Sequence, residues 1–298
     1  MQEEKKGILS ALGAYIIWGI FPLYWKGLQH VASEEVLAGR VIWSFILTLI
    51  FVVILKQWKM LLVDFKQLWQ HPKSFWLLVT AAYLISLNWF LYIWAVNNNH
   101  IVESSLGYYM NPLVSVLLGI FFLKEKLSKA QVMSFIIAAI GVLILVISYG
   151  QIPWLSFGLA LTFGVYGLLK KKVLVDATRG LVLETFFILP VAVAYYVYVY
   201  FHGNISFLHT DIKTDVLIIG TGIVTAVPLI LFATGAQKIP LYLVGFIQYV
   251  SPTIMLFLGV IVYGESFSGI DLLSFSFIWV ALILFSITKI IEVRKSKN

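Results

Sequence analysis

The segment that decides the fold covers residues 101–143, IVESSLGYYMNPLVSVLLGIFFLKEKLSKAQVMSFIIAAIGVL, and it recurs in diverged form 140 positions later. The second copy covers residues 241–283, LYLVGFIQYVSPTIMLFLGVIVYGESFSGIDLLSFSFIWVALI, and aligns with the first without a gap. The clearest shared positions are Tyr109, Pro112, Leu118, Gly119, Glu125, Ser128, Ser134 and Phe135, which recur as Tyr249, Pro252, Leu258, Gly259, Glu265, Ser268, Ser274 and Phe275. This duplication predicts a protein built from two related halves.

The two copies differ in the charge of the loop that follows the proline-bearing stretch. In the first copy this loop is KEKLSK (residues 124–129), whereas in the second it is GESFSG (residues 264–269), which contains no lysine or arginine. Basic loops of membrane proteins stay on the cytoplasmic side. The two copies are therefore expected to cross the membrane in opposite directions.

Composition supports a membrane protein. Of the 298 residues, 61% are hydrophobic and 12% are charged, and the mean hydropathy is +0.95. A water-soluble chain of this length needs more polar surface. The net charge of +7 fits a basic rim facing anionic lipid better than a nucleic-acid site. There is no cysteine, which excludes disulfides and thiolate metal sites.

A helix needs about 20 apolar residues to cross a bilayer, and ten stretches of the chain qualify. They are residues 7–25, 35–55, 74–96, 101–123, 130–149, 152–169, 180–201, 214–237, 239–263 and 270–290. The expected fold is an all-α integral membrane protein with ten transmembrane helices in two inverted five-helix repeats, residues 1–149 and 150–298. Residues 56–73 mix apolar and basic side chains at near-helical spacing, which indicates a helix along the inner membrane interface, for lipid anchoring or for binding a partner.

The positions of lysine and arginine support ten crossings with both termini in the cytoplasm. Eighteen fall on the predicted inner side: Lys5, Lys6, Lys56, Lys59, Lys66, Lys73, Lys124, Lys126, Lys129, Lys170, Lys171, Lys172, Arg179, Lys238, Lys289, Arg294, Lys295 and Lys297. Lys26 and Lys213 fall outside, and Arg40 lies within a predicted helix. Adding or removing one crossing would destroy this bias.

Several local stretches resemble the EamA repeats of the drug/metabolite transporter superfamily, and specifically its RarD-type permeases. They are GAYIIWG (13–19), RVIWS (40–44), NW (88–89), WAVNN (94–98), ESSLGY (103–108), NPL (111–113), YGL (166–168), PL (228–229), QY (248–249) and FIWVA (277–281). The resemblance covers nearly the whole chain. It implies a cytoplasmic-membrane permease with both termini inside and a central path. Because RarD proteins are labelled chloramphenicol permeases while other members move amino acids, nucleotide sugars or drugs, it does not fix the cargo.

Arg40 is predicted to lie inside the membrane, five residues into the second helix. A charge in hydrocarbon is costly and usually faces a cavity or a partner. It could hold an anionic or carboxylate group near the outer mouth. It could equally pair with Glu34, Glu35 or Glu103, or extend to the outer headgroups.

Glu103 begins a polar stripe on the fourth helix. Glu103, Gly107, Asn111 and Ser115 follow one another at i+4 steps, with Tyr108 beside them. Such a stripe favours a cavity wall where Glu103 binds a proton or an amine. The competing interpretation is a helix-to-helix hydrogen-bonding stripe.

Glu184 is predicted near the cytoplasmic end of the seventh helix, a place broadly equivalent to that of Arg40 in the second. It is a candidate gate or proton site. A pair with Arg179 or with the lysines at 170–172 is at least as good an interpretation.

Asn88 is the most central polar residue of the third helix, and its repeat partner is Pro228. Pro112 and Pro252 occupy matching places in the fourth and ninth helices. Bends at these prolines free backbone carbonyls near the midplane. The full set predicted to line the pathway is Arg40, Asn88, Glu103, Gly107, Tyr108, Asn111, Glu184, Gln248, Tyr249 and Ser251, with helix bends at Pro112, Pro228 and Pro252.

The sequence contains no P-loop and no zinc-hydrolase or serine-hydrolase motif, so we expect no enzyme, no metal site and no cofactor. The sequence favours a secondary transporter, not driven by ATP, of a small organic metabolite or drug. Export is one option for its direction, and proton coupling is left open. Its expected partners are that solute and membrane lipids. The alternative is a non-transport membrane protein such as a lipid scramblase, scaffold or sensor.

Overall fold

The computed structural model describes residues 2–97, 100–173, 175–203, 205–264 and 267–295, and throughout these ranges the regular structure is helical. Glu265, the second-copy counterpart of Glu125, lies outside the described residues. The helices are α1 (Gln2–Trp25), η1 (Lys26–Leu28), α2 (Ser33–Ile54), α3 (Trp58–Gln70), α4 (Pro72–Asn97), α5 (Ile101–Leu123), α6 (Lys129–Tyr149), α7 (Trp154–Lys172), α8 (Ala177–His202), α9 (Ile212–Lys238), α10 (Leu241–Gln248), α11 (Val250–Phe257), η2 (Leu258–Val262) and α12 (Gly269–Lys295).

Within the described residues, nine helices or helix runs are long and apolar enough to cross a membrane. The run Leu241–Val262, which joins α10, α11 and η2, counts as one of them. α7 is not among the nine. It is 19 residues long and its last turn is Lys170-Lys171-Lys172, so these cations lower the mean hydropathy of almost any window that could span.

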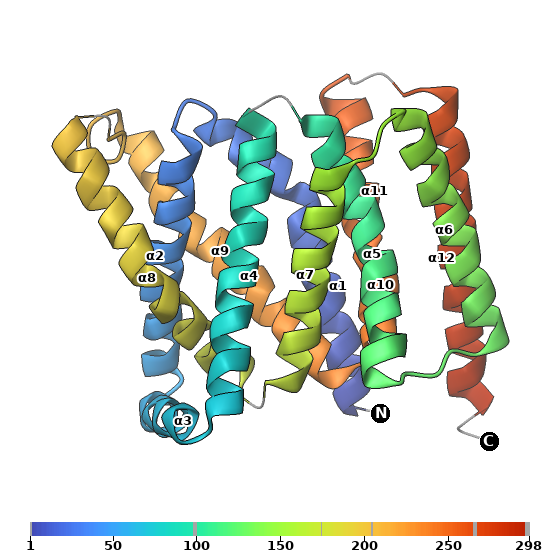
Figure 1. Ribbon diagram of the computed structural model, residues 1–298, viewed down its shortest axis with the longest axis horizontal. Coiled ribbons are helices and arrows are strands. Elements are labelled where there is room, and N and C mark those ends of the chain that lie inside the picture. The colour runs from blue at the N-terminus through green and yellow to red at the C-terminus, as the bar shows by residue number, and fades with distance from the viewer. Residues whose placement is uncertain (1, 98–99, 174, 204, 265–266, 296–298) are drawn as a thin grey trace.

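The helices run between two edges of the molecule, and both chain termini lie at the same edge (Figure 1). α3 lies across this terminal edge, and α6 and α12 stand together at one end of the bundle (Figure 1). α2 packs against α8 and α9, while α5 packs against α7 and α10. α1 packs against α9 and α11, and α4 against α7 and α8.

Large apolar side chains cover the outside of the bundle. Ile147 is 75% exposed, Phe121 72% and Ile54 68%. In water so much exposed apolar surface would be unfavourable, whereas in lipid it is the matching surface. The outside of the bundle is therefore built to contact hydrocarbon.

Glu125, which the repeat singles out, caps the start of α10. Its two carboxylate oxygens accept hydrogen bonds from the backbone N–H groups of Leu241 at 2.7 Å and Tyr242 at 2.9 Å. A carboxylate satisfies the free N–H groups of a helix N-terminus and interacts favourably with its dipole. The glutamate of the first copy thus fixes the position of the second copy's proline-bearing run.

One of the three prolines predicted to bend a helix coincides with a break. α10 ends at Gln248, four residues before Pro252, and α11 begins at Val250, two residues before it. Pro252 has no backbone N–H and so cannot donate the regular helical hydrogen bond to the Gln248 carbonyl. α5 and α9 continue as single helices through Pro112 and Pro228. Of these three prolines, Pro252 is therefore the one that lies beside a helix interruption.

Candidate functional site

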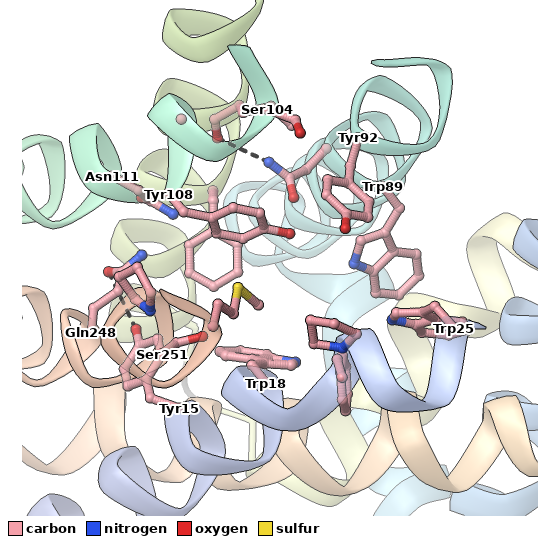
Figure 2. Close-up of a pocket in the computed structure, with 18 of the residues that line it drawn as sticks. Tyr15, Trp18, Trp25, Trp89, Tyr92, Ser104, Tyr108, Asn111, Gln248 and Ser251 are labelled. Carbon is pink, nitrogen blue, oxygen red and sulfur yellow. Dashed lines mark hydrogen bonds between the residues drawn. The ribbon is translucent and has the colours of Figure 1, made fainter. Parts of the chain in front are cut away.

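A central cavity of about 80 Å³ lies where α1, α2, α4, α5, α7, α9, α10 and α11 approach one another. Figure 2 shows aromatic rings and amides from several of these helices pointing into it. It is lined by Tyr15, Trp18, Phe21, Pro22, Trp25, Arg40, Asn88, Trp89, Tyr92, Ser104, Gly107, Tyr108, Asn111, Leu159, Phe163, Thr225, Leu229, Gln248, Ser251, Pro252 and Met255.

A wider vestibule of about 600 Å³ adjoins the cavity and shares Trp25, Arg40 and Tyr108 with it. The vestibule is also lined by Lys26 of η1, Ser33 at the start of α2 and residues near the start of α5. These helix ends lie at the edge opposite the termini (Figure 1). The hollow therefore leads from the middle of the bundle toward that opposite edge.

Arg40 is the charged side chain of the cavity. It is only 7% exposed, and its Nε donates a hydrogen bond to Thr225 Oγ1 at 3.1 Å. The guanidinium carbon lies 4.9 Å from the ring centroid of Trp25 and 4.5 Å from that of Trp89. Within the described residues the structure gives Arg40 no carboxylate partner.

Amide groups line the side of the cavity formed by α5 and α10. Gln248 Oε1 accepts long hydrogen bonds from the hydroxyls of Tyr15 at 3.4 Å and Ser115 at 3.5 Å. The Oδ1 atom of Asn111 is buried and has no hydrogen-bond partner in the described part of the chain. A buried unpaired acceptor is costly, so Asn111 is ready to accept a hydrogen bond from a solute or water.

Asn88 lines the cavity while fixing two helices together. Its Nδ2 donates to the carbonyl oxygen of Leu159 and to Thr162 Oγ1, both at 2.9 Å. This joins α4 to α7 through a side chain whose N–H groups are already used. Only its carbonyl oxygen remains to contact a solute.

The structure brings most of the predicted pathway residues together. Those that line the cavity are Arg40, Asn88, Gly107, Tyr108, Asn111, Gln248, Ser251 and Pro252. Glu103, Glu184, Tyr249, Pro112 and Pro228 do not line it.

Glu103 and Tyr249 face other surroundings. Glu103 lies 3.3 Å from the Nδ1 atom of His100, measured from its Oε2. Tyr249 packs with the buried residues Met110, Ala138 and Ile278 beside α6 and α12. The polar stripe of α5 therefore divides, and its Asn111 end reaches the cavity while its Glu103 end does not.

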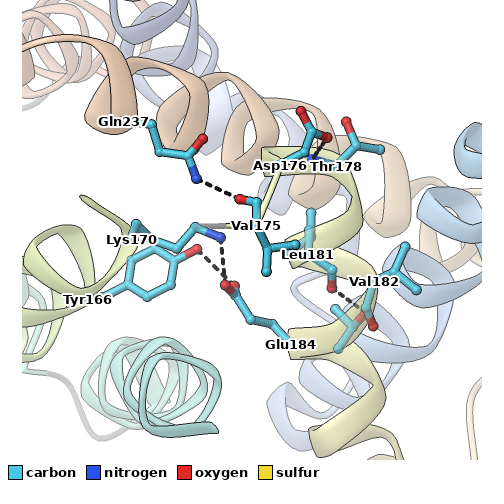
Figure 3. Close-up of polar contacts among 10 residues, drawn as sticks. Tyr166, Lys170, Val175, Asp176, Thr178, Leu181, Val182, Glu184 and Gln237 are labelled. Carbon is cyan, nitrogen blue, oxygen red and sulfur yellow. Dashed lines mark hydrogen bonds and ion pairs between the residues drawn. The ribbon is translucent and has the colours of Figure 1, made fainter. Parts of the chain in front are cut away.

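Glu184 lies in a buried ion pair toward the terminal edge. Its Oε1 accepts a hydrogen bond from Lys170 Nζ at 2.6 Å, and its Oε2 accepts one from the Tyr166 hydroxyl at 3.2 Å. Figure 3 shows this cluster beside the bond from Gln237 Nε2 to the carbonyl oxygen of Val175. These contacts connect α7, α8, α9 and the α7–α8 connection below the cavity.

A second basic contact lies at the same edge. Lys171 Nζ donates to the backbone oxygens of Ile239 at 2.5 Å and Ala236 at 3.3 Å. α7 is thus tied to the end of α9. This contact and the ion pair therefore hold α7, α8 and α9 together on the terminal side of the cavity, whereas the vestibule leads toward the opposite edge.

The aromatic wall was not predicted as a binding surface, although the sequence carries a signal for it. Tyr15, Trp18, Pro22 and Trp25 line the cavity from α1 and follow at i, i+3, i+7 and i+10, the spacing of one helix face. Trp89 is adjacent to Asn88. From the sequence, an aromatic cage for a solute is possible, but core or interface packing is the default for any single tryptophan, because one aromatic alone does not reveal what it faces.

An apolar helical bundle with aromatic and amide groups around a buried guanidinium, hollow toward one edge, has the architecture of a multi-pass membrane transporter. Residues 5–147 match the EamA-like transporter family. The chain is 46% identical to the uncharacterized transporter YojE of Bacillus subtilis strain 168, in an alignment that covers 99% of this chain and 98% of that relative. It is 41% identical to protein RarD of Escherichia coli K12, covering 100% of this chain and 99% of RarD. The chain belongs to the EamA-like transporter family and is of the RarD type.

Two further similarities agree with this assignment. The chloramphenicol-sensitive protein RarD of Pseudomonas aeruginosa is 31% identical, covering 95% of this chain and 94% of that protein. A solved crystal structure superimposes with a TM-score of 0.68 at 16% sequence identity, covering 93% of this chain and 97% of the other. That structure shows a common fold alone. The resemblance read from the sequence is confirmed, and the chain is a membrane transporter of a small solute.

Proposed function

We propose that this chain is a secondary transporter of a small organic solute that works by alternating access between two inverted five-helix repeats. The observation that carries the proposal is the asymmetry of the hollow. It leads to one edge through the vestibule, whereas toward the other edge α7 and α8 are joined by the buried Lys170–Glu184 pair. A transporter in a conformation that is open to one side of the membrane has this form.

The pattern of helix packing supports the repeat. If α1, α2, α4, α5 and α6 correspond to α7, α8, α9, α10–α11 and α12, then α2 against α8, α5 against α10 and α6 against α12 are pairs that map onto themselves. The packing of α1 on α9 maps onto that of α7 on α4, and the packing of α2 on α9 onto that of α8 on α4. This is the pattern that a pseudo-two-fold axis produces.

The positions of the termini support ten crossings. An odd number of crossings would put the two ends at opposite edges, and both lie at one edge (Figure 1). α7, which is not among the nine helices that are apolar enough by hydropathy, would be the tenth crossing. α3, which carries Lys59 and Lys66, and the ends of α5 and α7 lie at this terminal edge. This fits a cytoplasmic side of the cytoplasmic membrane, with both termini in the cytoplasm.

The transport cycle follows from this geometry. A solute enters the vestibule, binds in the central cavity, and is released after the contacts at the terminal edge open and the vestibule closes; the reverse direction uses the same two states. The pathway residues we assign are Arg40, Asn88, Gly107, Tyr108, Asn111, Gln248 and Ser251, with Lys170 and Glu184 toward the terminal edge.

Solute counterflow in proteoliposomes tests the proposal. Purified protein should exchange labelled members of a panel of small organic solutes with saturation, and Arg40→Gln should abolish that exchange. Lys213→Gln is the matched control, because Lys213 is an exposed cation at the start of α9 outside the hollow. Movement of fluorescent lipid without any solute exchange would instead identify a scramblase, and the absence of both would favour a scaffold or sensor.

A further inference from the structure

Resting on the proposed function, we propose that the cavity binds a small monocarboxylate that carries one flat apolar ring. The carboxylate would bind the guanidinium of Arg40, and the ring would lie in the aromatic part of the cavity. This assigns a substrate class to the site, which neither the fold nor the relatives' names provide.

The first argument is charge balance around Arg40. The nearby carboxylates have other partners, since Glu35 accepts hydrogen bonds from the backbone N–H groups of Ser206 and Phe207 and Glu103 pairs with His100. A buried ion without a counter-ion is strongly unfavourable. An anionic solute supplies the missing charge.

The second argument is the set of free donors. Arginine carries five N–H groups in a planar fork, and among the described residues Arg40 makes one side-chain hydrogen bond, from Nε to Thr225. Trp25 and Trp89 lie near the guanidinium at cation–π distance, which restrains its orientation. A carboxylate can accept two parallel hydrogen bonds from the remaining N–H groups of the guanidinium, which a monatomic anion cannot do.

The third argument is the shape and lining of the cavity beyond Arg40. Tyr15, Trp18, Phe163 and Leu229 form an apolar wall, with Trp18 edge-on to Phe163 at 5.5 Å between centroids. The cavity volume is about 80 Å³. This is smaller than the cavity of about 150 Å³ that holds a benzene ring, so at most one ring fits beside this wall, and the rest of a solute would extend past Arg40 into the vestibule.

The charges that line the hollow disfavour amines, zwitterions and phosphate esters. Of the described residues that line the cavity and the vestibule, none is aspartate or glutamate. An ammonium group would therefore find no counter-ion and would be repelled by Arg40, which disfavours amines and zwitterions. A phosphate monoester carries about two negative charges at neutral pH, one more than Arg40 balances within the cavity, since Lys26 lines the vestibule and not the cavity.

Calorimetric titration of the purified protein with five phenyl compounds tests the inference. Phenylacetate is the proposed ligand type, and phenylacetamide, phenethylamine, L-phenylalanine and phenyl phosphate present a neutral, cationic, zwitterionic and dianionic group on a similar ring. Phenylacetate should bind at least about 10-fold more tightly than the other four. Phenylacetamide and phenethylamine cannot make the charge-assisted hydrogen bonds to Arg40, and the ammonium group of L-phenylalanine and the second charge of phenyl phosphate have no counter-ion among the described residues that line the cavity. Arg40→Gln should weaken phenylacetate binding about 10- to 100-fold, while Lys213→Gln should not.

The outcomes separate this inference from the proposed function. Equal binding of phenylacetamide, tighter binding of any other member, no binding of phenylacetate, or unchanged binding in Arg40→Gln overturns the substrate class. If Arg40→Gln does not fold, the five-compound series on the natural protein still decides. Arg40-dependent binding of phenylacetate without counterflow supports the substrate class and overturns transport. Counterflow of a neutral or cationic solute alone supports transport and overturns the substrate class.

Discussion

Lys170 Nζ lies 2.6 Å from Glu184 Oε1, and each side chain is about 1% exposed. The pair joins α7 to α8 between the cavity and the terminal edge, and Tyr166 adds a hydrogen bond to the same carboxylate. Breaking one partner of such a pair leaves an uncompensated buried charge. Removal of either partner alone is therefore expected to destabilise the protein, whatever the net contribution of the intact pair.

Single and double substitutions measure how strongly Lys170 and Glu184 depend on each other. Lys170→Met and Glu184→Gln should each lower stability by about 3–5 kcal/mol, whereas the double variant should lose less than the sum, because both buried charges are then gone. Melting temperatures in detergent measure the effect. Arg179→Gln, which removes the half-buried pair with Asp64 on α3, is the control and should cost less. Additive losses in the double variant would argue against a coupled pair.

Cysteine labelling on this naturally cysteine-free chain tests the direction in which the hollow opens. Ser251→Cys and Asn111→Cys should react with a membrane-impermeant maleimide from the edge opposite the termini, and phenylacetate should slow the reaction. Ser134→Cys should stay protected, because Ser134 is buried on α6 and lines no part of the hollow. Labelling from the terminal side alone would reverse the assignment of the open edge.

Trp89 and Trp76 offer a matched test of the aromatic contact with Arg40. Both lie on α4, but Trp89 is 8% exposed and 4.5 Å from the guanidinium, whereas Trp76 is 63% exposed. Trp89→Leu should weaken phenylacetate binding by about 0.5–2 kcal/mol through the lost cation–π contact. Trp76→Leu should leave it unchanged. Equal effects in calorimetry would mean that Trp89 contributes only general packing.

Gly245 permits the close crossing of α10 and α5 that brings Gln248 and Asn111 to one cavity. A Cβ atom at this position would lie 2.8 Å from the carbonyl oxygen of Pro112. Gly245→Ala should therefore destabilise the protein by about 1–3 kcal/mol. Gly13→Ala is the control, because its added Cβ would meet Leu231 at an ordinary 3.5 Å. Equal melting temperatures for the two variants would contradict the crossing.

Sequence reasoning predicted much of the site, and its misses follow from helix geometry. Steps of four residues rotate by about 40° around a helix axis, so the α5 stripe that starts at Glu103 turns away from the face that carries Asn111. Ser104, seven residues before Asn111, stays on that face and lines the cavity. A stripe read at i+4 spacing alone could not distinguish these two ends.

The ion-pair partner of Glu184 could not be chosen from the sequence for a similar reason. Charge alone does not decide among Lys170, Lys171 and Lys172, because that choice depends on how α7 is rotated in the bundle. Tyr166 and Lys170 are four residues apart and both contact Glu184, while Lys171 reaches α9. The existence of α7 was predicted from its apolar run, whereas its rotation is set by packing against α4, α5 and α9.

Membrane potential should control transport of the proposed substrate. Neither Glu103 nor Glu184 lines the hollow, so among the described residues no carboxyl group lies where it would take up a proton together with the solute. Each cycle would then move one net negative charge. A potential of 100 mV is worth about 2.3 kcal/mol for one charge, which corresponds to an approximately 50-fold accumulation ratio and favours export from a cell that is negative inside.

Proteoliposomes with potassium gradients and valinomycin measure this dependence with labelled phenylacetate. The accumulation ratio should follow the imposed potential and should change little when a pH gradient is imposed instead. Protein-free liposomes correct for passive diffusion of the neutral acid. Accumulation that follows the pH gradient and ignores the potential would show that a proton accompanies the carboxylate, because a one-to-one pair carries no net charge and is insensitive to voltage.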